Sequence, residues 1–304
     1  MNKLKQLILV TILVVLFQPN RLQANTSSQH WGKSNQVGIG YFLSGQYDLF
    51  YSHFFKLVLD PKEQALARQS AEENLFAAYH KGITPKLVTT PYNRVIDAVT
   101  IVNSINQEQG AGLNYSLDFE IQSHKLNTLT SLTLSHRFQP IIKMKGNEFS
   151  KITNLHKIWL GRYTGLQEPL SSGVYSISIE YDNQVEQFDF LLDEFNQNNK
   201  LPPFPKIIKS ANQEHLVKWE NYKSNAFLEN RDKQKVILTT IKEGEVKATW
   251  HEERLPSSTN EAKFIVDLID KTPINFGINY VEIHTWGRLQ LLNAINYRIP
   301  ILTK

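Results

Sequence analysis

The sequence predicts an α+β fold, in which a small N-terminal helical hairpin or three-helix unit precedes two β-sandwich units of the immunoglobulin-like kind. Three observations predict this class. Apolar residues recur at helical spacing as far as about residue 81. From about residue 87 they alternate with polar residues, as they do in strands. The expected strands are short, regularly spaced and separated by polar turns without intervening helices, which is typical of β-sandwiches.

The helical part is expected over residues 31–81. Asp60 can cap a helix, Pro61 suits the first helical position, and Glu63 can bond back to the cap backbone. The Ala-rich stretch that follows ends before Gly82, a residue well suited to stop a helix. Earlier apolar residues at helical spacing predict the rest of the unit: Val37, Tyr41 and Phe42, then Leu49, Phe50, Phe54, Leu57 and Val58.

Two short motifs in this part, Gly45-Gln46-Tyr47-Asp48 and Leu59-Asp60-Pro61, resemble half of a tetratricopeptide repeat. In that family a glycine and a tyrosine open the second helix of a repeat, and a proline starts the next repeat. The spacing here is one residue short, and Phe50 stands where a small alanine is usual. The resemblance implies a peptide-binding groove, but a solenoid needs about three repeats to bury its core. The alternative is a helical cap with packed aromatic side chains, namely Tyr47, Phe50, Tyr51, Phe54 and Phe55.

The first β-rich unit contains several expected strands, at Val95–Asn103, Tyr115–Ile121 and Leu129–Leu134. The clearest hairpin signal spans Tyr175–Leu192, where apolar and polar residues alternate on both sides of a turn. Asp182-Asn183 forms that turn, because both residue types tolerate left-handed geometry. This pattern predicts an antiparallel sheet with one solvent-exposed face.

The second β-rich unit repeats the theme over the last hundred residues. Glu243-Gly244 lies between two apolar runs and indicates another hairpin. Pro300, in the last run, suits an edge strand because proline cannot donate to a sheet ladder. The expected strands are Leu216–Trp219, Val236–Ile241, Val246–Trp250, Ile278–Trp286 and Leu291–Ile301.

A polar, proline-containing stretch over residues 196–206 reads as a linker, since such a composition is extended and stiff. It sets the boundary between the two β-rich units. The predicted domains are residues 1–24 as a signal peptide, 25–85 as the helical segment, 86–198 as the first β-sandwich and 199–304 as the second.

The N-terminus has the pattern of a secretory signal peptide. Lys3 and Lys5 precede an apolar run over Leu7–Phe17, and cleavage is expected between Ala24 and Asn25. The run is shorter than the roughly 20 residues that span a bilayer. The alternative is an uncleaved N-terminal anchor. The expected location of the mature protein is the periplasm or the exterior, with no membrane span after cleavage.

Removal of the signal peptide changes the charge. The full chain has 33 basic and 29 acidic residues, and the signal peptide holds three of the basic ones, so the mature chain has 30 against 29. Bulk charge therefore does not indicate a nucleic-acid partner. The chain has no cysteine, which excludes disulfides, thiol catalysis and thiolate metal sites.

The sequence contains no recognisable catalytic, cofactor or metal motif, and we expect a non-enzymatic protein without a cofactor. The nine histidines are spread singly, and no two have the spacing of a helical zinc site. His251-Glu252-Glu253 is the densest candidate, but it reads as the solvated end of a strand. His284 beside Trp286 reads as a pair on a sheet face. Asp193-Glu194 is an acidic pair of the kind a glycosidase could use, and a polar loop explains it better.

Aromatic residues are frequent, and an exported β-protein can use some of the 33 to hold sugars or peptides. Trp159, Arg162 and Tyr163 lie between the expected strands. They are the candidate protein-contact surface.

The layout also resembles a group of uncharacterised secreted proteins of Vibrio-like bacteria that are encoded beside a two-component sensor kinase. The shared features are a signal peptide, a short helical segment with a Gly-Gln-Tyr-Asp step, a Pro-Leu-Ser-Ser-Gly-Val-Tyr stretch at Pro169–Tyr175 and a Tyr-Arg-Ile-Pro-Ile strand at Tyr297–Ile301. The resemblance implies an accessory periplasmic protein that acts with a sensor or an envelope complex.

The sequence leaves three functions open. The first is an exported, non-enzymatic accessory or binding protein that engages a cell-envelope protein. The second is a carbohydrate-active envelope hydrolase, which requires paired carboxylates or a His-carboxylate pair in a cleft. The third is a chaperone-like structural module that exchanges strands at a sheet edge.

Overall fold

The computed structural model describes most of the chain between residues 26 and 301. The predicted signal peptide with its cleavage site at Ala24 and Asn25 lies outside the described residues, as do most of the predicted linker and the expected strand Val246–Trp250. The described ranges are 26–85, 95–108, 112–153, 157–193, 206–211, 214–218, 235–242, 251–255, 261–265 and 274–301.

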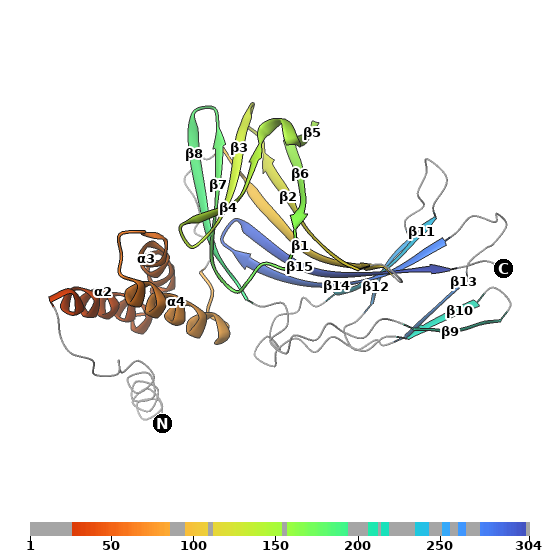
Figure 1. Ribbon diagram of the computed structural model, residues 1–304, viewed down its shortest axis with the longest axis horizontal. Coiled ribbons are helices and arrows are strands. Elements are labelled where there is room, and N and C mark those ends of the chain that lie inside the picture. The colour runs from red at the N-terminus through yellow and green to blue at the C-terminus, as the bar shows by residue number, and fades with distance from the viewer. Residues whose placement is uncertain are drawn as a thin grey trace, which may run out of the picture.

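Three helices form the N-terminal unit: α2 (Thr26–Leu43), α3 (Tyr47–Leu59) and α4 (Ala65–His80). They gather at one end of the molecule (Figure 1). The predicted start of the last helix at Pro61 is wrong. Asp60 caps a tight turn instead, in which its carboxylate accepts the Lys62 amide at 2.9 Å and its carbonyl accepts the Glu63 amide at 3.2 Å. The predicted stop at Gly82 is confirmed, because this residue has a φ of +75° and donates to the Tyr79 carbonyl at 2.8 Å.

Fifteen strands are described, and they form three sheets. An eight-stranded sheet has the order β12-β11-β14-β15-β1-β2-β6-β5, a four-stranded sheet the order β4-β3-β7-β8, and a three-stranded sheet the order β13-β10-β9. The first eight strands are β1 (Ala98–Glu108), β2 (Leu113–Ser123), β3 (Leu129–His136), β4 (Gln139–Lys145), β5 (Phe149–Thr153), β6 (Lys157–Leu166), β7 (Gly173–Tyr181) and β8 (Gln184–Leu192), with a 3₁₀ turn at Gly146–Glu148. The others are β9 (Lys206–Ala211), β10 (Glu214–Lys218), β11 (Lys235–Lys242), β12 (His251–Leu255), β13 (Glu261–Ile265), β14 (Ile274–Trp286) and β15 (Leu289–Ile301).

Strands β1 to β8 have the connectivity of an immunoglobulin-like sandwich. If they are lettered A, B, C, C′, D, E, F and G in chain order, one sheet reads A-B-E-D and the other C′-C-F-G. Apolar side chains of both sheets share one buried cluster, as Phe119 of β2 and Ile177 of β7 illustrate. Tyr175, near the start of β7, donates its hydroxyl to the Ser171 carbonyl at 2.7 Å, the contact known as a tyrosine corner. The predicted α+β class with immunoglobulin-like sandwich architecture is confirmed.

The hairpin predicted at Tyr175–Leu192 is also confirmed, as β7 and β8 pair in antiparallel register from Gly173–Leu192 to Tyr181–Gln184. Asp182 and Asn183 form its turn with φ of 44° and 60°. Both residues therefore adopt the left-handed geometry that the sequence indicated.

The last two strands extend the A-B-E-D sheet. β15 pairs in parallel with β1 over ten positions, from Val99–Leu289 to Glu108–Arg298, and in antiparallel fashion with β14. Two asparagine pairs join β1 and β15 in this register. Asn103 donates to Asn293 at 3.1 Å, and Asn296 donates to Asn106 at 2.8 Å. A shift by one residue would separate both pairs, so they help to fix the register.

The eight-stranded sheet thus contains strands from both sides of the predicted boundary at residues 198–199. That the chain folds as two separate units divided at this boundary stays a prediction. The expectation that Pro300 lies in an edge strand is wrong, because β15 lies between β14 and β1. Pro300 pairs with Asn275 of β14 and lies two residues beyond the last described β1–β15 pair, so a proline is accommodated there.

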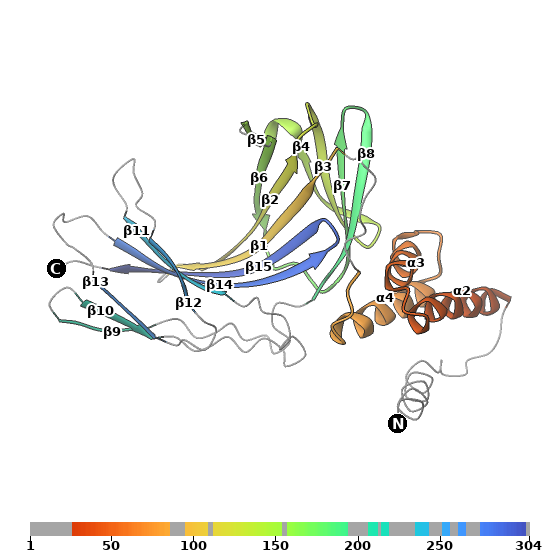
Figure 2. The ribbon, with the colours of Figure 1, turned by 180° about the vertical axis from the view of Figure 1, so that it is seen from behind.

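The N-terminal helices pack against the tip of the β14–β15 hairpin. Trp286 of β14 is 4% exposed and contacts three helix rings, with centroid separations of 5.1 Å to Tyr79, 5.7 Å to Tyr51 and 6.3 Å to Phe55. The Tyr79 hydroxyl also hydrogen-bonds Nδ1 of the buried His284. The helical cap that the sequence offered as one alternative is therefore seen, with its aromatic side chains packed. Figure 2 shows the helices from behind, at the end opposite to β9 and β10.

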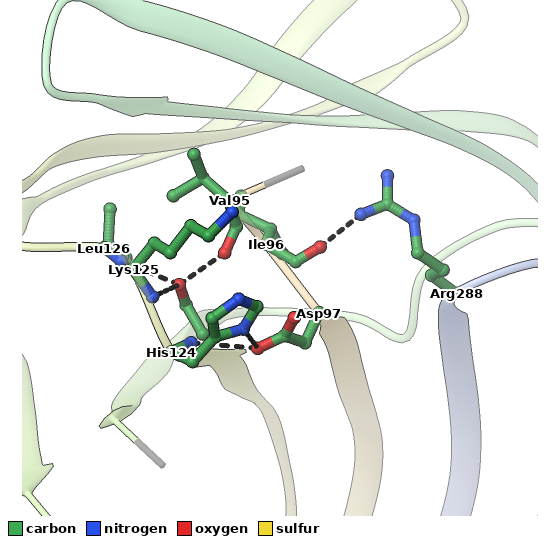
Figure 3. A network of polar contacts seen from close by, with 8 residues as sticks. Val95, Ile96, Asp97, His124, Lys125, Leu126 and Arg288 are labelled. Atoms are coloured by element: carbon green, nitrogen blue, oxygen red, sulfur yellow. Dashed lines mark hydrogen bonds and ion pairs between the residues drawn. The ribbon is translucent and has the colours of Figure 1, made fainter. Parts of the chain in front are cut away.

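A polar network secures the segment that leads into β1 (Figure 3). Asp97 accepts both the backbone amide of His124 at 2.9 Å and its ring Nδ1 at 2.7 Å. From the other side, Arg288 of the β14–β15 turn donates to the carbonyl of Ile96 and to the carboxylate of Glu186 in β8. Arg288 therefore joins the two sheets of the sandwich at the point where β1 starts.

Candidate functional site

The residues predicted to form a contact surface lie on one strand but on opposite faces of it. Trp159 of β6 is 8% exposed and packs toward the core, with the Lys151 ammonium 4.9 Å from its ring centre. Tyr163 lies on the same face and packs against the hydrophobic cluster. Arg162 lies on the outer face, where it forms a two-point ion pair with Asp118 at 2.5 and 3.1 Å. The structure does not bring the three side chains together on one surface.

A different part of the described structure forms a pocket, at the seam between α4 and the turn that joins β3 to β4. Its volume is about 430 Å³, a size within the usual range for ligand sites. Helix α4 contributes Ala65, Arg68, Gln69 and Glu72, and the turn contributes residues 136–139. The helical unit and the sandwich therefore build the pocket together.

Arg68 forms the helix side of the pocket. Its Nη1 donates to the carbonyls of Pro61 at 3.2 Å and Glu63 at 2.7 Å, which holds the side chain against the loop before α4. Its guanidinium carbon lies 4.7 Å from the ring centre of Phe138, a cation–π contact across the seam. Phe138 is 36% exposed, so part of this residue is accessible to a ligand.

Arg137 and Glu72 form the floor of the pocket. The Arg137 Nη2 donates to the Glu72 carboxylate at 2.9 Å, and the other carboxylate oxygen accepts the backbone amide of Val174 in β7 at 3.0 Å. Glu72 is 8% exposed, so this buried charge is compensated by a guanidinium and by a buried amide. The carboxylate therefore links α4 to the β3–β4 turn and to the start of β7.

The backbone of Arg137 is unusual. Its φ is +55°, in a two-residue turn where glycine is the favoured occupant of such a position. A non-glycine residue in this region costs roughly 1–3 kcal/mol, and such residues cluster at functional sites. The backbone amide of Arg137 donates to the Val174 carbonyl at 2.7 Å, which fixes the turn against β7.

His136, the last residue of β3, also lines the pocket. Its ring stacks on Tyr175 with centroids 4.7 Å apart and an interplanar angle of 13°. Burial, and then the nearby Arg137 guanidinium, hold the pKa of His136 below its usual value, so the ring is neutral near pH 7. Its Nε2 is buried without a partner in the part of the chain that the structure describes, and it faces Gly173, whose missing side chain leaves it room. Burial likewise raises the pKa of Tyr175.

The chemistry of the pocket is that of a binding site for a group rich in hydrogen-bond acceptors. Two guanidinium groups and one carboxylate line the pocket, and Gln69 and Gln139 add neutral amides. Glu72 is the one carboxylate among the described lining residues, so the pair of carboxylates that a glycosidase uses is not assembled here. Over the same described residues, no cluster of three potential metal ligands occurs.

The sequence pattern did not reveal this pocket. Arg137 and Phe138 stand between two strands without the glycine or asparagine that marks a tight turn. Glu72 lies in an Ala-rich helix where a carboxylate is expected on the solvent side. A buried acid on a helix and a cationic turn 65 residues later along the chain become a pair only through the tertiary fold.

Other histidines and acids form pairs elsewhere. His80 of α4 contacts the Asp193 carboxylate at 2.9 Å, directly after β8, and thereby adds a polar link between helix and sandwich. His53 contacts Ser34 between α3 and α2. His251-Glu252-Glu253 lies at the start of β12, paired with β11.

None of the helices in the described part of the chain is both long and apolar enough to cross a bilayer. No protein-family model matches the chain, and no curated protein matches it. Among solved structures, the fibronectin domains FN1–FN3 of chicken CNTN1 align with 68% of this chain and 69% of that chain, at 9% identity and a TM-score of 0.26. The fold assignment above therefore depends on strand order and register, not on this likeness.

Proposed function

We propose that the protein is an exported, non-enzymatic accessory protein that binds a partner protein of the cell envelope at the seam between α4 and the β3–β4 turn. The observation that carries this proposal is the pocket that the helical unit and the sandwich build together. Export is supported by the N-terminal signal pattern, and immunoglobulin-like sandwiches commonly serve as binding modules in exported proteins.

Photocrosslinking in intact cells tests the proposed surface. A photoreactive amino acid at Gln139, on the exposed rim of the pocket, is expected to capture an envelope protein. The matched control is Val185, which is 65% exposed and pairs with Glu180, at the opposite end of the four-stranded sheet from the pocket. Equal capture at both positions, or capture only at Val185, would place the partner elsewhere.

Export is tested separately. N-terminal sequencing of the protein from the periplasmic or external fraction is expected to start at Asn25, directly after Ala24. A chain that retains Met1 and sediments with membranes would instead be held by an uncleaved anchor.

A strand-exchanging structural module is the second candidate, and one observation favours it. The A edge of the sandwich is covered by β15, a strand that follows β1 in the chain only after the other seven sandwich strands and β9 to β14. The same edge of one molecule could receive β15 of another, because the pairing uses main-chain hydrogen bonds.

The absence of native cysteine makes exchange simple to test. Ser104 and Ala294 are register partners and are both buried. One chain carries Ser104→Cys and a second carries Ala294→Cys, and the two are mixed and oxidised. A covalent dimer that forms during co-folding supports exchange. Failure to form it, while a doubly substituted chain closes its own disulfide, excludes exchange.

A further inference from the structure

We propose that the pocket between α4 and the β3–β4 turn binds a carboxylate. This inference rests on the proposed function, and it names the chemical group that the site receives. The carboxylate can come from the C-terminus of a partner protein or from a free organic acid, and the experiment below separates the two sources.

The charge of the pocket favours a monoanion. Arg68 and Arg137 contribute two positive charges, and Glu72 contributes one negative charge. His136 adds no charge near pH 7, because burial and the neighbouring Arg137 lower its pKa. The described lining therefore has a net charge of one positive unit, which a carboxylate neutralises. A doubly charged phosphate ester would leave an excess negative charge close to Glu72, so the carboxylate is favoured.

The hydrogen-bond donors of the pocket exceed its acceptors. A guanidinium has five N–H groups. Within the described structure, Arg68 donates side-chain hydrogen bonds only from Nη1, and Arg137 donates one, from Nη2 to Glu72. Both residues therefore retain N–H groups for a ligand. The Glu72 oxygens already accept from Arg137 and from the Val174 amide, so the floor offers little to a cationic ligand.

The start of α4 adds to this preference. Ala65, the first residue of the helix, lines the pocket, and Gln64 makes no side-chain capping bond. The first amides of a helix have no partner within the helix, and the helix dipole places positive potential there. The two guanidinium groups and this helix end act in the same direction.

The strained backbone of Arg137 is consistent with the inference. Glycine would adopt a φ of +55° without strain, and it would also remove the guanidinium. The chain instead keeps arginine in this turn. Arginine is the side chain best suited to bind a carboxylate through two parallel hydrogen bonds.

The pocket is larger than a carboxylate group alone. Its volume of about 430 Å³ leaves space for the residue that carries the carboxylate. The exposed part of Phe138 can pack against an apolar part of that residue, and Gln69 and Gln139 can pair with amide groups next to it. This combination fits the last residues of a polypeptide chain, and we therefore favour a C-terminal carboxylate over a free acid.

The test uses the purified exported protein and defined probes. The first probe is a pool of tetrapeptides that vary at the last two positions and end in a free carboxylate. The second is the same pool with a C-terminal amide. The third and fourth probes are sodium benzoate and inorganic phosphate. Retention of the peptides is measured by mass spectrometry, and the small anions are added as competitors. Free-acid peptides are expected to be retained at least about tenfold better than their amides, because a charge-assisted pair of hydrogen bonds is lost in the amide.

Substitutions at Gln139 report the charge preference without disturbing the core, because this side chain is exposed. Gln139→Glu is expected to weaken retention of the free acids by about tenfold, and Gln139→Lys is expected to strengthen it. Arg137→Gln is expected to abolish it. The matched control is Arg162→Gln, which removes an exposed arginine of β6 that is paired with Asp118 of β2, and neither residue lines the pocket. It should leave retention unchanged.

The outcomes separate the two proposals. Competition by benzoate at equal concentration identifies a free organic acid as the source, and peptide binding without such competition identifies a C-terminus; both support the inference. Tighter binding of phosphate, equal retention of acids and amides, or stronger retention by Gln139→Glu overturns it. If no probe binds while Gln139 still crosslinks to an envelope protein, the carboxylate inference fails and the proposed function stands. If neither is seen, both fail.

Discussion

Removal of the Glu72 carboxylate is the sharpest test of how the helical unit is held on the sandwich. Glu72→Ala leaves the Val174 amide without an acceptor, in a residue that is 0% exposed. An unsatisfied buried amide costs about 1–3 kcal/mol. The lost pair with Arg137 adds less, because half of the arginine side chain is exposed and solvent screens the interaction. We expect the free energy of unfolding to fall by about 2–3 kcal/mol.

Urea denaturation followed by circular dichroism measures this change, and hydrogen exchange locates it. The amide of Val174 is expected to exchange faster in Glu72→Ala, while amides in β1 keep their protection relative to the global stability. Glu72→Gln retains an acceptor for Val174 and should recover about half of the loss. The control on the same helix is Glu73→Ala, since Glu73 is exposed and accepts only the Gln69 amide at 3.0 Å among the described contacts.

A stability loss for Glu72→Ala no larger than that for Glu73→Ala, with unchanged exchange at Val174, would falsify the reasoning. The helical unit would then be held by its other contacts, namely the aromatic packing on Trp286 and the polar links of His80 to Asp193 and of Tyr79 to His284.

Three further predictions follow from single side chains. Gly146→Ala should lower the free energy of unfolding by about 2–3 kcal/mol, because the added Cβ would overlap the Leu129 carbonyl. Gly40→Ala, in α2 where an added Cβ meets no neighbour, should raise it by about 0.5–1 kcal/mol. Thermal unfolding compares the two variants. Because burial lowers the pKa of His136, stability should be full above about pH 6.5 and fall as pH drops through the lowered pKa, and urea midpoints at pH 7.5 and 5.5 should differ less in His136→Gln. Arg288→Met should cost about 3 kcal/mol, since it breaks a largely buried ion pair between the two sheets, and a loss under 1 kcal/mol in urea unfolding would contradict this.

The sequence predicts local structure where one residue type has a strong conformational preference. Gly82 and the Asp182-Asn183 pair end a helix and form a turn as expected, because few other residues accept their backbone angles. The sequence predicts a start of α4 at Pro61, four residues before the observed start at Ala65. Asp60 has the same side-chain chemistry for a cap and for a tight turn, and the sequence does not say which of the two forms.

The long-range features could not be predicted in the same way. The hairpin signals in the sequence predict only antiparallel neighbours, and the parallel pairing of β1 with β15 joins two segments almost 200 residues apart. The candidate site has the same origin. Arg137 occupies a position that favours glycine, so its turn carries no sequence signal, and its partner Glu72 is defined only once α4 docks.

The contact between the first helices and the β14–β15 hairpin has a consequence for the order of folding. Tyr79 and His284 are 205 residues apart in the chain, and Trp286 supplies the ring on which α3 and α4 pack. While the chain is synthesised from its N-terminus, the helices therefore lack their packing partner and β1 lacks its neighbour strand β15. This contact can close only after the last strands have been made, and the large sequence separation of its two sides makes its closure a late and slow step of folding.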